Sequence, residues 1–296
     1  MKSFAFKKLD AFTSGLSSGN PAGYIRLSGI SEISESEMQR IAYELKNFVS
    51  EVGYVAPSGD DGVDYTIRYF SCEKEVPFCG HATVAIAYEL VKENTSISSR
   101  PHFSISTKKG ILRIENRVEH ENLVYIQAPL PVFIECGVDV ASLADALNIS
   151  TRDIDSTIPL GIVNAGQNTL LVPLRNSETC ITCSPDYNAL RNYSFKNNVE
   201  VINIYTSNTV HEENDFRTRV FAPTFGYLED PATGSGNAAL GYYLINQNRW
   251  NVERLIIEQG VDRENPNIVV LRKIHDTEIL IGGRGVARIQ GEYLLN

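Results

Sequence analysis

The sequence has few cysteines, no long apolar stretch and no cluster of basic residues. Five cysteines in 296 residues are too few for a disulfide-stapled scaffold. No apolar stretch approaches the roughly 18 residues that a membrane-spanning helix needs. The 27 Lys+Arg against 36 Asp+Glu leave a net charge of −9, and an acidic chain without a basic patch is a poor partner for nucleic acid. We therefore expect neither nucleic acid nor a membrane as a partner.

The N-terminal residues and the overall composition point to a globular cytoplasmic protein. Met1–Lys8 carries lysines where a signal peptide would place its apolar segment. Hydrophobic residues at 43% and charged residues at 21% are ordinary values, which excludes a disordered or fibrous chain. At roughly 100–200 residues per domain, the length predicts about two domains or one large one.

Common cofactor signatures are also missing. No Gly-Lys-Ser/Thr phosphate loop is present, and no G-x-G-x-x-G opens a helix. Cys180 and Cys183 have C-x-x-C spacing, but no second Cys or His pair lies at the distance of a structural zinc site. We interpret them as two neighbouring thiols in a strand. The sequence therefore predicts no cofactor and no metal.

What the sequence does contain is an internal repeat. Arg68-Tyr69-Phe70 recurs as Arg219-Val220-Phe221, and each triplet ends a period-2 segment typical of a strand. Cys79–Thr83 is matched by Thr233–Asn237, and each is followed by apolar residues at helical spacing. This repeat predicts an α+β fold of two similar halves related by a pseudo-two-fold axis. Each half is expected to wrap a curved mixed sheet around one central helix.

The same patterns predict the main elements and the domain boundary. Helices are expected at about 34–46, 83–93, 140–147 and 235–246. Pro129 and Pro131 interrupt a strand-like run that ends at Gln127. The expected domains are residues 1–129, joined by a last strand at about 284–296, and residues 130–283.

In each half, a strand leads through a loop into a glycine and then into the expected central helix. Such a helix start offers free backbone N–H groups and the positive end of the helix dipole, which together bind an anion. If the halves face each other across the pseudo-dyad, both helix starts open on one cleft that suits a carboxylate substrate. The alternative is that Gly80 and Gly234 only permit tight strand-to-helix packing. The matched pair, with polar residues beside both glycines, favours the site.

Seven segments along the chain resemble one known family. They are Asp10-Ala11-Phe12, Gly19-Asn20-Pro21, Ser50-Glu51, Arg68-Tyr69-Phe70, Cys79–Thr83, Glu229–Ser235 and Gly282-Gly283. Together they resemble the PhzF-like proteins, a family named for a phenazine-biosynthesis isomerase. The resemblance implies a diaminopimelate-epimerase-like fold with the site between two halves, a homodimer, and a cofactor-independent isomerase.

The resemblance also implies residue roles. Glu51 matches the carboxylate that shuttles a proton, His81 and Asp230 its polar partners, and Ser235 a hydroxyl at the second helix start. A carboxylate can remove a proton from one carbon and return it to another, while helix N–H groups stabilise the developing charge. The substrate is expected to be a small molecule with a carboxylate. The expected substrate-binding residues are Asn20, Gly80, Ala82, Gly234 and Gly236.

The chain departs from the family pattern at Ser71–Lys74 and at Val52–Tyr54, two segments that we expect to line the pocket. Two other functions stay open. A two-base racemase or epimerase would use a thiol ahead of each glycine turn, but only Cys79 is a thiol, since Thr233 holds the second position. A non-catalytic protein that binds a metabolite in the same cleft is the third possibility.

Overall fold

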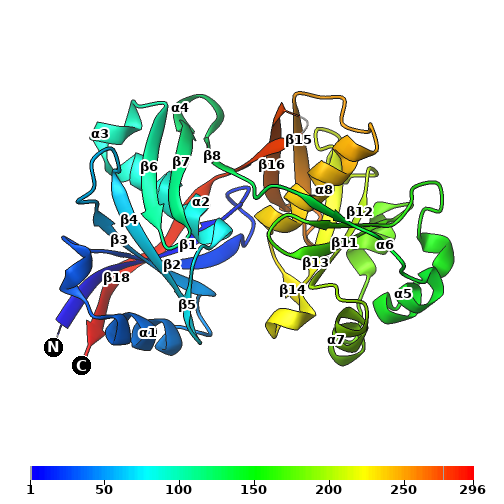
Figure 1. The fold of residues 1–296 in the computed structure, drawn as a ribbon, viewed down its shortest axis with the longest axis horizontal. Coiled ribbons are helices and arrows are strands. Elements are labelled where there is room, and N and C mark those ends of the chain that lie inside the picture. Colours follow the sequence, from blue (N-terminus) through cyan, green and yellow to red (C-terminus); the bar gives the residue numbers. More distant parts are fainter. Residues whose placement is uncertain (1, 276) are drawn as a thin grey trace. The chain divides into compact units, whose positions relative to one another are not determined.

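The computed structural model describes residues 2–275 and 277–296. The chain forms two compact units, which we call unit 1 (Met1–Gln127 and Gly282–Asn296) and unit 2 (Ala128–Ile281) (Figure 1). Both ends of the chain therefore belong to unit 1, and unit 2 is inserted between them. None of the helices in the described residues combines the length and the apolar character that crossing a membrane requires.

Unit 1 contains a mixture of strands and helices. They are β1 (Lys2–Ala11), β2 (Asn20–Arg26), η1 (Ile30–Glu32), α1 (Glu35–Glu44), β3 (Glu51–Pro57), β4 (Tyr65–Ser71), β5 (Glu75–Val76), α2 (Gly80–Glu93), α3 (Thr95–Ser98), β6 (His102–Thr107), β7 (Gly110–Arg117), α4 (Val118–Glu121), β8 (Leu123–Gln127) and β18 (Gly285–Leu295).

Unit 2 has a similar mixture, with β17 running across its boundary. The elements are β9 (Val132–Ile134), α5 (Val140–Leu147), η2 (Thr151–Asp153), β10 (Gly161–Asn164), β11 (Asn168–Pro173), α6 (Ser177–Thr182), α7 (Tyr187–Lys196), β12 (Val201–Thr206), β13 (Phe216–Phe221), η3 (Pro223–Phe225), β14 (Glu229–Asp230), α8 (Gly234–Asn246), β15 (Arg254–Gln259), β16 (Asn267–His275) and β17 (Glu278–Gly283).

The two units share one pairing scheme. In unit 1, β1 pairs antiparallel with β2, β2 parallel with β3, β3 antiparallel with β4, and β4 parallel with β6. Unit 2 repeats this order with β10, β11, β12, β13 and β15. The α+β class with two similar halves is therefore confirmed. The registers Val52↔Phe70 and Ile202↔Phe221 make residues of the two units equivalent, so Glu51 corresponds to Val201.

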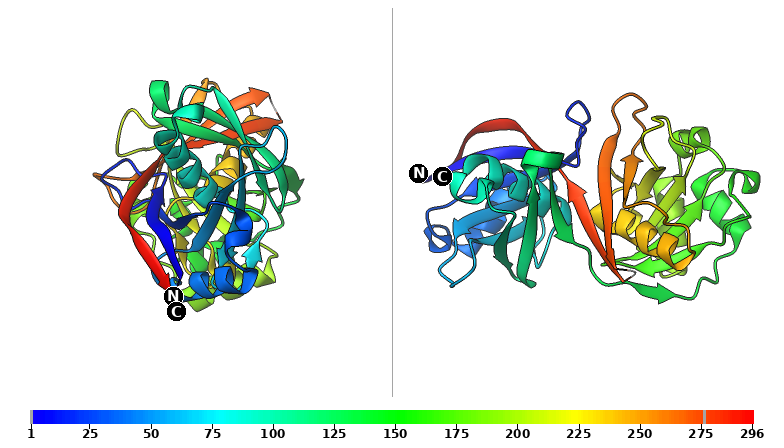
Figure 2. Two further views of the ribbon diagram at one scale, coloured as in Figure 1. Left: turned by 90° about the vertical axis from the view of Figure 1, so that its left-hand side faces the viewer. Right: turned by 90° about the horizontal axis from the view of Figure 1, so that it is seen from above.

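One buried helix forms the centre of each unit. Every residue from Ala82 to Val91 in α2 is buried, and α2 contacts β1, β2, β3, β7, β8 and β18. In unit 2, α8 is buried from Gly236 to Leu244 and contacts β10, β11, β12 and β16. A helix that is apolar all round is stable only when it is enclosed. Figures 1 and 2 show the strands of each unit around its helix.

The central helices begin slightly earlier than the sequence pattern predicts. α2 starts at Gly80 rather than Thr83, and α8 at Gly234 rather than Ser235. Cys79 and Thr233 are the extended residues before the first turn, and their carbonyls accept the N–H groups of Thr83 and Asn237. The glycines and their small neighbours therefore belong to the first helical turn, where apolar periodicity gives no signal.

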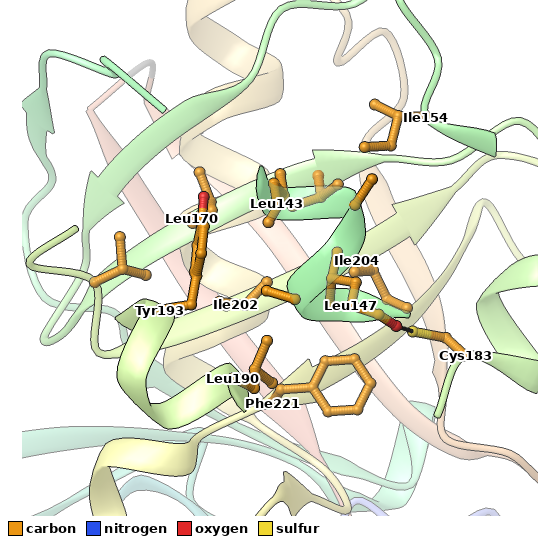
Figure 3. Close-up of a cluster of buried hydrophobic side chains, with 14 of the residues drawn as sticks. Leu143, Leu147, Ile154, Leu170, Cys183, Leu190, Tyr193, Ile202, Ile204 and Phe221 are labelled. Carbon is orange, nitrogen blue, oxygen red and sulfur yellow. Dashed lines mark hydrogen bonds between the residues drawn. The ribbon is translucent and has the colours of Figure 1, made fainter. Parts of the chain in front are cut away.

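The shorter helices pack on the outer faces of the sheets. In unit 1, Met38 and Ile41 of α1 join a buried cluster with Val52 of β3 and Phe70 of β4. In unit 2, α5 and α7 cover strands β11, β12 and β13 in a second apolar cluster (Figure 3). Its members include Leu143, Leu147, Leu170, Leu190, Ile202, Ile204 and Phe221.

The expectation that Cys180 and Cys183 lie in a strand is wrong. Cys180 lies in the helix α6 and Cys183 is its C-cap, because the Asn176 side chain accepts the N–H of Thr179 and caps the first turn. The Cys183 thiol donates to the Leu147 carbonyl at 3.3 Å (Figure 3). Burial raises the pKa of Cys180 to about 12 and that of Cys183 to about 11. Both are therefore protonated packing residues.

The last strand completes unit 1. β18 pairs antiparallel with β1 from Lys2↔Leu295 to Ala11↔Gly285, with a register shift after Lys8. Figure 2 shows the two chain ends side by side. At Gly285, a Cβ atom would lie 2.8 Å from the backbone of Ala85 in α2, so glycine permits this close approach of the strand to the central helix.

Candidate active site

Three chemically active side chains meet at the start of α2. The Nε2 atom of His81 lies 3.3 Å from Oε2 of Glu51. The Cys79 Sγ atom lies 3.6 Å from the same carboxylate oxygen and 3.5 Å from Nδ1 of His81. The side chains of His81 and Glu51 are 14% and 22% exposed, and Cys79 is 8% exposed. The cluster is therefore mostly withdrawn from solvent but reachable from it.

Regular secondary structure positions each member of this cluster. Glu51 is the first residue of β3 and is paired with Ala22 of β2 on one side and Ser71 of β4 on the other. Cys79 is the N-cap of α2, and His81 is the second residue of that helix. A strand end and a helix start therefore bring together residues that are 28 and 30 positions apart.

A buried hydrogen-bond chain fixes the backbone at Cys79. The Thr83 hydroxyl donates to the Cys79 carbonyl at 2.7 Å. Since its one proton is used there, the Thr83 oxygen accepts from the Tyr69 hydroxyl, also at 2.7 Å. Burial raises the pKa of Tyr69 above its ordinary value, so this hydroxyl stays neutral and remains a donor.

Both central helices begin with free backbone donors. Neither α2 nor α8 has a side-chain cap. Within the described residues, the N–H groups of residues 80–82 and 234–236 find no acceptor. Each helix start therefore presents three N–H groups and the positive end of its dipole, the combination that favours a carboxylate or a developing negative charge.

The start of α8 has a different set of polar side chains. The Thr233 hydroxyl donates to Oδ2 of Asp230 at 2.6 Å, and the Ser235 hydroxyl donates to Oε1 of Gln167 at 3.0 Å. Gln259 accepts the Thr233 N–H at 3.0 Å and the Asn237 side-chain amide at 2.8 Å. Asp230 and Ser235 are both half-buried, so a small molecule at the helix start could reach both.

The expected site residues thus fall into two groups. Unit 1 brings Glu51 and His81 into contact and adds Gly80 and Ala82 in the first turn of α2. Unit 2 places Asp230, Ser235, Gly234 and Gly236 around the first turn of α8. Asn20 opens β2, is 2% exposed, and lies beside Pro21, whose carbonyl accepts the Ser50 N–H just before Glu51. That the two groups meet on one substrate stays a prediction.

Sequence analysis missed two partners in unit 2. Gln167 lies in the tight connection between β10 and β11, where the isolated glutamine gives no local signal, and its contact with Ser235 arises from folding alone. Gln259 ends β15 at the position equivalent to Thr107 of β6. The internal repeat therefore offered a signal for Gln259, since both repeats place a polar residue at the end of that strand.

One of the two segments that depart from the family pattern does not line the site. Val52 is fully buried in the core, Gly53 faces Ile86 of α2, and the Tyr54 hydroxyl donates to the Met38 carbonyl. The expectation for Val52–Tyr54 is therefore wrong, because the strand is covered on both faces. The other segment lies next to the site. Ser71 pairs with Glu51, and the Ser71 N–H donates to the Lys74 carbonyl, which forms a turn.

Residues 9–291 match the PhzC-PhzF family model, described as phenazine biosynthesis-like protein. An uncharacterized isomerase of Bacillus subtilis is 33% identical over 88% of this chain and 87% of its own. The trans-2,3-dihydro-3-hydroxyanthranilate isomerase of Pseudomonas chlororaphis is 28% identical over 97% of this chain and 98% of its own.

Solved structures agree. The crystal structure of a Bacillus anthracis phenazine biosynthesis protein of the PhzF family superposes with a TM-score of 0.86 at 27% identity, covering 100% of both chains. A probable proline racemase from Agrobacterium radiobacter has a TM-score of 0.64 at 11% identity, covering 99% of this chain and 93% of its own, which shows the shared epimerase-like fold. The chain therefore belongs to the PhzC-PhzF family of phenazine biosynthesis-like proteins and is an isomerase.

Proposed function

We propose that this isomerase moves a proton between two carbons of a small carboxylate-bearing metabolite without a cofactor, with Glu51 as the acid and base. The observation that carries the proposal is the position of Glu51. Its carboxylate is held at a strand end, 3.3 Å from the His81 ring, beside a helix start whose N–H groups are free. A base and an anion-stabilising group at one place are what carbon deprotonation requires.

In the proposed reaction, the Glu51 carboxylate removes a proton from a substrate carbon. The charge that develops spreads toward the substrate's electron-withdrawing group, where the N–H groups of residues 80–82 stabilise it. The protonated Glu51 then returns the proton to a second carbon, so the substrate is isomerised and the enzyme is unchanged. The His81 ring is placed to hydrogen-bond the carboxylate or the substrate, and so orients the transfer.

Unit 2 supplies the second part of the proposed site. Asp230 and Ser235 are its polar contacts with the substrate, and the N–H groups of residues 234–236 bind an anionic group. Asn20 is proposed to bind the same substrate from unit 1. The dihydro-hydroxyanthranilate named for one relative is the first compound to test, because it has a carboxylate. The unusual turn at residues 71–74, next to Glu51, favours a different substituent near the base.

The proposal is tested by solvent exchange. The purified chain is incubated in deuterium oxide with a panel of small carboxylates, and NMR follows deuterium entering at carbon. For a compound that exchanges, Glu51→Gln keeps the size of the side chain but removes the base, so the rate is expected to fall roughly 10²–10⁴-fold. Thermal melts confirm that the variant is folded. An unchanged rate in folded Glu51→Gln would overturn the proposed base.

The same assay separates the two alternatives. A thiol-based epimerase is disfavoured because Thr233 holds the position equivalent to Cys79. Replacing Cys79 with Ala is therefore expected to leave most of the exchange, whereas a thiol base would make this variant inactive. A metabolite-binding protein would bind a carboxylate without exchanging its carbon-bound protons. We also propose that the protein is a homodimer, which is tested by light scattering after gel filtration. We propose that it is cytoplasmic, which is tested by cell fractionation.

A further inference from the structure

The three side chains that meet at the start of α2 carry donor atoms of the kinds that bind metal ions. Within residues 2–275 and 277–296, Glu51, Cys79 and His81 are a group whose ligand atoms all lie within 4.8 Å of one another. A thiolate, an imidazole and a carboxylate are the donors that zinc accepts, whereas Mg²⁺ and Ca²⁺ prefer oxygen alone. The donor chemistry therefore selects a transition-metal ion.

The distances between the donor atoms are close to those of a zinc site. A tetrahedral zinc site has a Zn–S bond of about 2.3 Å and Zn–N and Zn–O bonds of about 2.0 Å. In such a site the sulfur lies about 3.5 Å from the nitrogen and from the oxygen, and these two atoms lie about 3.3 Å apart. Here Cys79 Sγ lies 3.6 Å from Glu51 Oε2 and 3.9 Å from His81 Nε2. The remaining donor–donor distance, from His81 Nε2 to Glu51 Oε2, is 3.3 Å. His81 Nδ1 lies closer to the Cys79 sulfur, at 3.5 Å, so the imidazole ring must turn to direct one nitrogen at an ion that the sulfur also binds.

We propose that Glu51, Cys79 and His81 bind one Zn²⁺ ion, with a water or a ligand oxygen in the fourth position. On binding, the Cys79 thiol releases its proton to solvent and the sulfur becomes a thiolate ligand. The site is preorganised, because Glu51 is fixed between two paired strands and the Cys79 carbonyl accepts both the N–H and the hydroxyl of Thr83. Rotation of the His81 ring is the adjustment that binding requires.

The equivalent positions in unit 2 provide an internal comparison. There Val201, Thr233 and Ser235 replace Glu51, Cys79 and His81. None of these three side chains is a strong zinc ligand, so the same scaffold in unit 2 does not form such a set. The predicted stoichiometry is therefore one ion per chain.

Zinc at this site has a consequence for the isomerase. A carboxylate that coordinates a metal ion is a much weaker base toward carbon, because the cation withdraws electron density from both of its oxygens. Zinc is therefore a reversible inhibitor, and this consequence rests on the proposed role of Glu51. Metal binding itself does not rest on that role, so the two are measured separately.

Metal binding is tested on the metal-free, tag-free full chain with Co²⁺ as a spectroscopic probe. We expect one tetrahedral Co²⁺ per chain with a thiolate-to-cobalt charge-transfer band, which stoichiometric Zn²⁺ abolishes by displacement. Cys79→Ser removes the band and weakens zinc binding, measured by calorimetry, at least about 100-fold. Glu51→Gln and His81→Gln each weaken it at least about 10-fold; changes to outer-shell partners already cost 10–100-fold. Cys136→Ser, which alters a half-buried thiol of unit 2, is the matched control and binds as the unmodified chain does.

Three results would overturn the site: no thiolate band in the unmodified chain, an unchanged band in Cys79→Ser, or equal zinc affinity in all variants. Exchange is then measured during a zinc titration, and EDTA restores the rate if zinc is a reversible inhibitor. Zinc that binds with the band but leaves exchange unchanged would overturn the role of Glu51 and leave the metal site standing. If Glu51→Gln loses exchange but the unmodified chain shows no cobalt band, the metal site is overturned and the role of Glu51 stands.

Discussion

The first turns of α2 and α8 have the same backbone, and the side chains around them differ. Both follow an extended N-cap residue, both lack a side-chain cap, and both lie beside a two-residue strand paired with the strand before it. An arginine–glutamate ion pair also recurs, as Arg68–Glu75 in unit 1 and Arg219–Glu229 in unit 2. These shared features are the scaffold.

The chemistry is distributed unequally on this scaffold. Glu51, the proposed base, corresponds to Val201 in unit 2, and Asp230 corresponds to Val76 in unit 1. Besides the glutamate of the shared ion pair, each unit therefore has a carboxylate near its helix start at a position where the other unit has valine. A symmetric two-base mechanism needs the same group in both units. The comparison instead favours a division of roles, with proton transfer in unit 1 and substrate contacts in unit 2.

The largest expected effect is on stability, at one position of the strand pairing that both units repeat. In unit 2, Arg217 and Glu258 are opposite each other, fully buried and joined at 2.9 Å. Glu258 also accepts the Val210 N–H, which fixes the preceding loop. Glu258→Gln leaves a buried cation unpaired, so we expect a loss of about 3–5 kcal/mol in the free energy of unfolding.

Urea unfolding followed by Trp250 fluorescence measures this loss, because the one tryptophan of the chain lies in unit 2. At the equivalent place in unit 1, Thr66 is opposite Ser106, and both are half-buried. Ser106→Ala is the control. It is followed by circular dichroism, because unit 1 has no tryptophan, and is expected to change stability by less than about 0.5 kcal/mol. A loss under about 1 kcal/mol for Glu258→Gln would contradict the predicted cost of an unpaired buried charge.

The next effect tests the division of roles. Asp230→Asn keeps the shape of the side chain and an acceptor for the Thr233 hydroxyl, but removes the charge. A hydrogen bond to a charged group contributes about 1.5–3 kcal/mol, so the exchange rate is expected to fall about 10–100-fold. The neighbouring acid Glu229 is bound to Arg219, and Glu229→Gln is the control, expected to keep exchange within about twofold. A wild-type rate in Asp230→Asn would confine the chemistry to unit 1.

The smallest effect is the pH dependence of unit 1. Hydrogen bonds from Arg68, helped by Lys108, lower the pKa of Glu75 from 4.5 to about 2. Because the folded-state pKa is depressed, the ion pair stabilises the fold fully above pH 4.5 and progressively less as the pH falls toward 2. Melting temperatures measured by circular dichroism across this window should fall less steeply for Glu75→Gln than for the unmodified chain. Arg68→Met should flatten the curve likewise, and parallel curves for all three proteins would refute the prediction.

The spacing of hydrophobic residues and the positions of glycine and proline were enough to predict much of the fold. The helix at 140–147 has the predicted bounds, because Asp139 caps it and its apolar residues recur at helical spacing. The two similar halves followed from Arg68–Phe70 and its repeat Arg219–Phe221. α6 was missed because its six residues are too few for a helical period, and its cap at Asn176 was not recognised.

The candidate site was harder to predict from sequence. Family resemblance alone pointed to Glu51, since a glutamate at a strand end has no local signature. His81 and Asp230 were also indicated by their positions near the two glycine turns. The approach of Cys79 to Glu51 depends on strand register and helix start together, which no local pattern encodes. The same holds for Gln167, whose contact with Ser235 joins residues 68 positions apart.

The pairing of β1 with β18 has a consequence for the order of synthesis. β1 needs a strand on each side, and β18 contains residues 285–295, so every residue of unit 2 leaves the ribosome before β1 acquires its second neighbour. Unit 2 is continuous and can fold first. During that time unit 1 has an unpaired edge strand, which is a template for pairing with other chains. A nascent chain stalled in unit 2 is therefore the species in which this protein is most prone to aggregate.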